Sequence, residues 1–82
     1  MARVTEFDVY RLDALGYPID VATYTEMPKA LEYARKHAPK FAAVVVERRH
    51  MESNVFGDAV ETVDTEVVWH AGSEEALIAW GG

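Results

Sequence analysis

The sequence predicts an α+β fold, a two-layer sandwich in which one main helix covers an antiparallel-rich four-stranded sheet. Segments in which apolar and polar residues alternate, a pattern typical of half-buried strands, occur on both sides of a central segment with the period of an amphipathic helix. The connections between these segments are short, which favours antiparallel neighbours. The expected order is therefore β-β-α-β-β, followed by a short C-terminal helix.

The length and composition indicate one folded domain. A chain of 82 residues is too short for two hydrophobic cores, so residues 1–82 are expected to form a single unit. Half of the residues are hydrophobic, which excludes a disordered chain. The absence of cysteine excludes disulfides and thiolate chemistry, and no apolar run reaches the roughly 18 residues of a membrane-spanning helix. We therefore expect a cytoplasmic protein.

The first half of the chain predicts a β-hairpin followed by a helix. Residues 3–12 and 19–25 alternate as strands, and residues 13–18 contain the aspartate, glycine and proline of a hairpin loop. Residues 28–38 form the helix, with Thr25 or Met27 as the expected N-cap and Pro39 ending the helix at Ala38. Its apolar stripe consists of Met27, Ala30, Leu31, Ala34 and Ala38.

The second half predicts a central strand, a loop, a long strand and a terminal helix. The apolar run 42–46 is typical of a strand covered on both faces, and the charged residues that follow it are expected to project into water. Residues 51–58 are interpreted as a loop and 59–71 as a strand with a bend or turn near Asp64, with Val67 and Trp69 on one face. Ser73 and Gly81 are the expected N-cap and end of the last helix.

The charges are distributed unevenly along the sequence. The formal net charge is −6, which disfavours direct binding to nucleic acid or to an anionic membrane. Residues 21–50 hold three acids and six bases, whereas residues 51–82 hold seven acids and no lysine or arginine. Arg48 and Arg49 suggest either a basic patch or pairing with the acidic strand that follows, and the second interpretation is the simpler one.

The acidic last third is the candidate partner-binding surface. Alternate carboxylates on a strand are about 6.6 to 7 Å apart, close to the spacing of successive phosphates in a nucleic-acid strand. A second interpretation is protection of an edge strand by like charges. The candidate partner-binding residues are Asp58, Glu61, Asp64, Glu66, Glu74 and Glu75, together with the aromatic Tyr33 as a surface anchor.

No motif for catalysis, metal binding or cofactor binding is present in the sequence. The glycines form neither a dinucleotide-binding nor a phosphate-binding loop, and the serines lack a nucleophile motif. If the last two strands pair antiparallel, His50 and His70 lie about 20 to 30 Å apart, which argues against a shared metal. We therefore assign no catalytic residue, no metal ligand and no cofactor.

These observations favour a small non-enzymatic intracellular protein that acts through protein–protein binding, as an inhibitor, an accessory subunit or a homodimer. The alternative is an acidic nucleic-acid mimic that blocks a basic nucleic-acid-binding protein. In length and charge the chain is similar to small acidic proteins of phages and mobile elements that act in this way. A third hypothesis, from a different class, is a small enzyme that uses His50 or His70 with a carboxylate.

Overall fold

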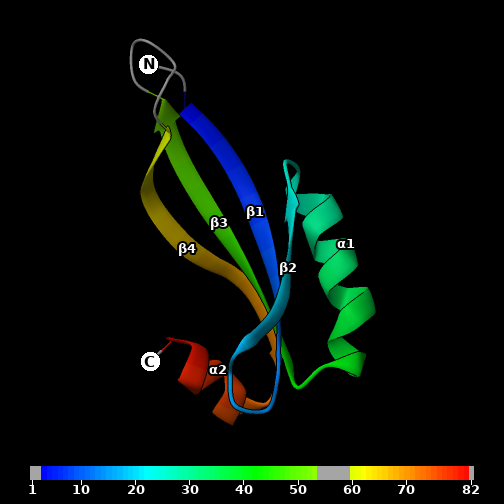
Figure 1. Ribbon diagram of the computed structural model, residues 1–82. Coiled ribbons are helices and arrows are strands. Elements are labelled where there is room, and N and C mark those ends of the chain that lie inside the picture. Colours follow the sequence, from blue (N-terminus) through cyan, green and yellow to red (C-terminus); the bar gives the residue numbers. More distant parts are fainter. Residues whose placement is uncertain (1–2, 54–59, 82) are drawn as a thin grey trace.

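The computed structural model describes residues 3–53 and 60–81, and it confirms the predicted α+β fold (Figure 1). The strands form a four-stranded sheet in the order β2-β1-β3-β4, with all neighbours antiparallel. The elements are β1 (Arg3–Leu12), β2 (Pro18–Tyr24), α1 (Met27–His37), the 3₁₀ turn η1 (Ala38–Lys40), β3 (Ala43–Ser53), β4 (Val60–Gly72) and α2 (Glu74–Gly81).

A tight hairpin joins β1 to β2, as predicted. The backbone N–H of Asp13 donates to the carbonyl of Tyr17 at 2.9 Å, and the Asp13 carboxylate accepts from the backbone N–H groups of Leu15 and Tyr17. Gly16 has a φ of 83°, a conformation that residues with a Cβ rarely adopt. A Cβ at this position would lie 2.6 Å from the Cβ of Ala79, so the hairpin packs directly against α2.

The ends of α1 differ in detail from the prediction. Glu26 is the N-cap, because its carbonyl accepts the first helical bond from the N–H of Ala30 at 3.2 Å. The expectation of Thr25 or Met27 in this role was therefore wrong, and the side chain of Glu26 makes no capping bond. The helix ends at His37, and the chain continues for one 3₁₀ turn that includes the predicted helix breaker, Pro39.

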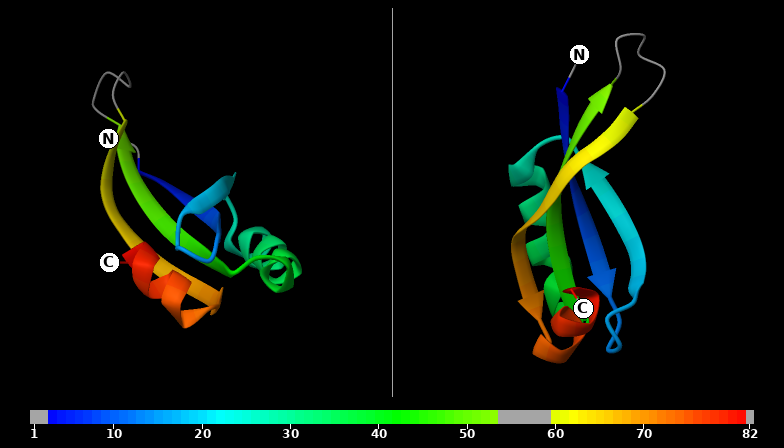
Figure 2. Two further views of the ribbon diagram at one scale, coloured as in Figure 1. Left: turned by 60° about the horizontal axis from the view of Figure 1, so that its bottom comes forward. Right: turned by 90° about the vertical axis from the view of Figure 1, so that its left-hand side faces the viewer.

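The core lies on both faces of the central strand β3, because α1 and α2 cover opposite faces of the sheet (Figure 2). Val44 and Val46 face α1, whereas Val45 faces α2, so the apolar run is buried on both sides as predicted. The α1 side of the core also contains Phe7, Val9, Ala30 and Ala34, and the α2 side contains Leu12, Ala43 and Ala76.

Two expectations about β3 were wrong. Residues 51–53 belong to the strand rather than to a loop, whereas residues 54–58 of the predicted loop lie outside the described residues. The charged residues from Glu47 to His50 do not project into water. They are half-buried, because β1 and β4 continue on either side and pair with them along their whole length.

Strand β4 is continuous through the predicted bend near Asp64. Instead of a turn, the pairing of β4 with β3 has two register shifts. One lies between Val46 and Glu47, and the other lies between His50, which pairs with Asp64, and Met51. Such bulges bend a strand and change which residues share a face. Val67 pairs with Glu47 and Trp69 pairs with Val46, so Val67 and Trp69 lie on opposite faces, contrary to the prediction.

The terminal helix α2 begins and ends as predicted and packs on this sheet. The Ser73 hydroxyl accepts from the N–H of Ala76 at 3.4 Å, and the Ser73 carbonyl accepts from the N–H of Leu77 at 3.1 Å. The ring of Trp80 lies 4.5 Å from the ring of Tyr10, measured between centroids. Within the described ranges, no helix has the length and apolar composition needed to cross a membrane.

Candidate functional site

The face of the sheet opposite α1 is covered by α2 at one end, and no other described element lies over the rest of it (Figure 2). Residues that pair across antiparallel strands share a face, so the register identifies the side chains of this surface. The surface, called here the open face, consists of Val4, Glu6 and Asp8 of β1, Val21 and Thr23 of β2, Glu47, Arg49 and Met51 of β3, and Thr65 and Val67 of β4.

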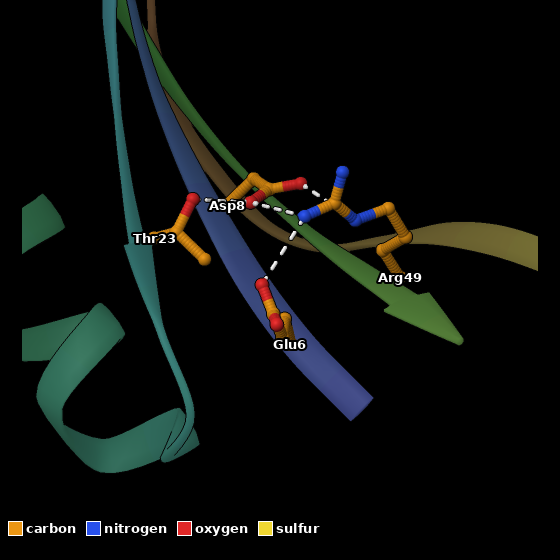
Figure 3. Close-up of polar contacts among 4 residues, drawn as sticks. All are labelled: Glu6, Asp8, Thr23 and Arg49. Atoms are coloured by element: carbon orange, nitrogen blue, oxygen red, sulfur yellow. Dashed lines mark hydrogen bonds and ion pairs between the residues drawn. The ribbon is translucent and has the colours of Figure 1, made fainter. Parts of the chain in front are cut away.

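A group of charged side chains occupies the middle of the open face (Figure 3). The Nη2 atom of Arg49 lies 3.2 Å from Oε2 of Glu6 and 3.5 Å from Oδ1 of Asp8. Its Nε atom lies 3.4 Å from Oδ2 of Asp8, an ion-pair contact without hydrogen-bond geometry. Thr23 donates its hydroxyl to Oδ1 of Asp8 at 2.8 Å. Together with Glu47, which pairs with Asp8 across the strands, these residues form the polar cluster.

Asp8 is buried although it lies on the uncovered side of the sheet. Only 2 % of its surface is exposed, because β1 is an inner strand and Thr23 and Glu47 flank Asp8 from the two neighbouring strands. A buried carboxylate is costly unless a cation and hydrogen-bond donors compensate for the lost water. The guanidinium of Arg49 and the hydroxyl of Thr23 provide this compensation.

The polar cluster contains more negative than positive charge. Glu6 and Asp8 contact a single guanidinium, that of Arg49, and Glu47 adds a third carboxyl group next to Asp8. Burial raises the pKa of Glu47, the charge of Asp8 raises it further, and Arg49 opposes this shift. The pKa of the nearby Tyr10 hydroxyl is also raised, first by burial and then by the charges of Asp8 and Glu47. The cluster therefore provides a negative potential that would favour a cation.

An apolar groove of about 370 Å³ lies between α2 and β4, next to the polar cluster. Val67 lines the groove and also pairs with Glu47, so the groove and the cluster share a boundary. The groove is lined by Val45, Val67, Leu77, Ile78 and Trp80, with His70 and Glu74 as its polar members. This predominantly apolar lining is suited to holding an apolar side chain.

Exposed aliphatic side chains surround the polar cluster. Val4 on β1 is 43 % exposed, Val21 on β2 is 52 % exposed and Val67 on β4 is 45 % exposed. Ile78 of α2, at the groove, is also largely exposed. The open face thus combines exposed apolar residues from several elements with a charged centre.

The α1-facing side of the sheet has a different charge pattern. Arg48 forms an ion pair with Glu66, and Arg11 forms one with Asp20. Arg48 and Arg49 thus pair within the molecule, which confirms the simpler interpretation of the basic run, although Arg49 pairs with β1 rather than with β4. The lysines of the described chain are in α1 and η1, at Lys29, Lys36 and Lys40.

The structure does not bring the described partner-binding candidates onto one surface. Asp64 and Glu66 lie on the α1-facing side of β4, opposite His50 and Arg48. Tyr33 belongs to α1 and is half-buried, with its ring 5.6 Å from that of Tyr24 and 4.2 Å from that of His37. Glu74 and Glu75 begin α2, where Glu74 lines the groove. Asp58 and the side chain of Glu61 lie outside the described residues.

The histidines are also placed apart. His50 pairs with Asp64, and its Nδ1 atom lies 2.8 Å from the hydroxyl of Thr5. His70 pairs with Val45 and lines the groove instead. Among the side chains that the structure describes, no group of three or more histidine and carboxylate residues is arranged to hold a metal ion.

The fold and this surface define a small antiparallel α+β domain with one largely uncovered sheet face. Comparison of the chain with protein-family models, with characterised proteins and with solved structures finds no match. Inference about function therefore depends on the surface itself.

Proposed function

We propose that this protein is a non-enzymatic binding protein that engages another protein through its open face. The observation that supports this most strongly is the coincidence of three features on that face: the polar cluster, the apolar groove and the exposed aliphatic residues. Protein interfaces typically combine apolar contact area with a few ordered polar groups, and groups that are already held in place lose little entropy on binding.

A different protein is a better candidate for the partner than a second copy of this chain. In a symmetric dimer through the open face, the negatively charged cluster of one copy would lie close to that of the other. Like charges brought together in this way oppose association. We therefore propose that the isolated protein is monomeric. Light scattering at micromolar concentration tests this directly, and a dimer of the wild-type protein would contradict it.

The nucleic-acid-mimic hypothesis receives less support. It requires a row of free carboxylates along β4, but Glu66 is paired with Arg48. Asp64 and Glu66 also lie on the opposite side of the sheet from the polar cluster. The carboxylates in excess are instead on the open face, where they are mixed with apolar residues. This mixture favours an ordinary protein interface.

The proposal is tested by affinity capture from the cells that produce the protein, with two matched variants. Val67→Lys places a cation on the open face, whereas Met27→Lys makes the same change on α1, and both residues are exposed in the wild type. We expect a saturable partner that is lost with Val67→Lys and retained with Met27→Lys. Retention by both variants, or equal loss from both, would contradict the proposal. Circular dichroism spectra establish that both variants fold.

A further inference from the structure

We infer that the open face binds an extended segment of a basic protein, with a large apolar side chain in the groove and a lysine or arginine beside Glu47. This inference rests on the proposed function and specifies the chemistry of the partner. The groove, the register between strands, and the distribution of charge over the two sides of the sheet all support it.

The groove is the part of the open face that binds the apolar side chain of the partner. It is formed by side chains from both the sheet and α2, and its volume of about 370 Å³ is large enough to admit an aromatic or long aliphatic side chain. Trp80 at the groove packs its ring against that of Tyr10, with the two centroids 4.5 Å apart. Ile78 and Val67 are exposed there and lose water contact when an apolar group enters.

The positions of Val45 and Glu47 on β3 determine the distance between the groove and the Glu47 carboxyl group. Val45 lines the groove, and Glu47 lies two residues further along the same face of β3, a separation of about 6.6 to 7 Å. Alternate side chains of an extended peptide have the same spacing. A segment with an apolar residue in the groove therefore presents the side chain two positions away at Glu47.

Charge complementarity determines the charge of the partner side chain that lies at Glu47. Arg49 is engaged by Glu6 and Asp8, and within the described part of the chain Glu47 has no cation in ion-pair contact. Glu74 adds a further carboxylate at the groove. Among the described side chains, Arg49 is the only lysine or arginine on the open face, because the others belong to α1, to η1 or to the α1-facing side. A basic partner is therefore attracted to the open face.

The inference is tested with a defined peptide and does not require the natural partner. The probe is a blocked Arg-Gly-Trp-Gly-Arg peptide, which has an arginine two positions from the tryptophan in either chain direction. The matched controls are Glu-Gly-Trp-Gly-Glu, which reverses the charge, and Arg-Gly-Ala-Gly-Arg, which removes the apolar anchor. Amide chemical shifts of the ¹⁵N-labelled protein report both the affinity and the location of binding.

We expect the probe to bind at least about fivefold more tightly than either control, with shifts concentrated at Glu47, Val67 and α2. Glu47→Gln should weaken binding about fivefold, whereas Glu32→Gln on the exposed side of α1 should change it less than twofold. Equal binding of the three peptides, shifts spread over all acidic segments, or equal effects of the two variants would each overturn the inference.

The peptide and capture experiments fail in distinguishable ways. A captured partner that depends on Val67, combined with no preference for the basic peptide, supports the proposed function and overturns the inference about a basic partner. A basic peptide that binds at Glu47, combined with no partner that depends on Val67, overturns the proposed function and with it the inference.

Discussion

Arg49→Met is the most informative perturbation of the polar cluster. It removes the cation that contacts Asp8, which is 2 % exposed, and leaves that carboxylate beside Glu6 and Glu47. Removing one partner of a fully buried ion pair typically costs about 3 to 5 kcal/mol. Because 31 % of the Arg49 side chain is exposed and Thr23 still donates to Asp8, we expect a smaller loss of about 2 kcal/mol.

The adjacent residue provides a matched control. Arg48→Met removes the same type of side chain from the opposite face, where Arg48 pairs with the more exposed Glu66. Exposed ion pairs contribute little, so we expect a loss of about 0.5 kcal/mol. Asp8→Asn combined with Arg49→Met removes the uncompensated negative charge and should recover part of the stability that the single Arg49 variant loses.

Urea denaturation at neutral pH, followed by tryptophan fluorescence, measures these effects. With a urea dependence of about 1 kcal/mol per molar, expected for a domain of this size, Arg49→Met lowers the midpoint by about 2 M and Arg48→Met by about 0.5 M. Midpoints that agree within about 0.5 M for the two variants would refute the argument that the polar cluster is a buried ion-pair network. So would the absence of any recovery in the double variant.

Three further predictions concern other parts of the molecule. Because the pKa of Glu47 is raised in the folded protein, deprotonation of this carboxyl group destabilises the fold as the pH rises through that pKa. Glu47→Gln should therefore be more stable than wild type at pH 7 in urea denaturation and equal to it below the usual carboxyl range. Gly16→Ala, which places a Cβ against α2 at a φ of 83°, should cost about 2 kcal/mol or more, whereas Gly81→Ala, with nothing within 4 Å, should leave the melting temperature unchanged or raise it. Burial of the His37 ring and the charge of Arg11 lower the pKa of His37, so its NMR titration midpoint should lie below 6.5 and rise in Arg11→Met; an unchanged midpoint in that variant would contradict the proposed effect of Arg11.

The sequence was sufficient to predict the elements and the central position of β3. The apolar run of β3 required cover on both faces, and Ser73 marked the start of α2, because these signals are local. The faces of β4 were predicted wrongly, since a bulge between paired strands leaves no local signal. The shift opposite Val46 and Glu47 places Val67 on the open face and Trp69 on the α1-facing side, where it packs against the core.

The candidate site could not be predicted from charge counts along the chain. Glu6 and Asp8 are separated by one residue in the sequence, which is the period that places both on one face of a strand. Their proximity to Glu47 and Arg49 depends on the pairing of β1 with β3, which are separated by a hairpin and a helix. Counting charges by segment assigned significance to the last third of the chain, whereas the cluster forms between residues of the first and the middle thirds.

Site-specific photo-crosslinking in the producing cells tests most directly whether the open face is the working surface. A benzophenone-bearing phenylalanine analogue replaces Val67 on the open face in one variant and Met27 on α1 in another, both at exposed positions. We predict a discrete crosslinked protein partner from position 67 and none from position 27. A partner crosslinked from position 27 alone, or equally from both positions, would contradict the assignment of the open face as the binding surface.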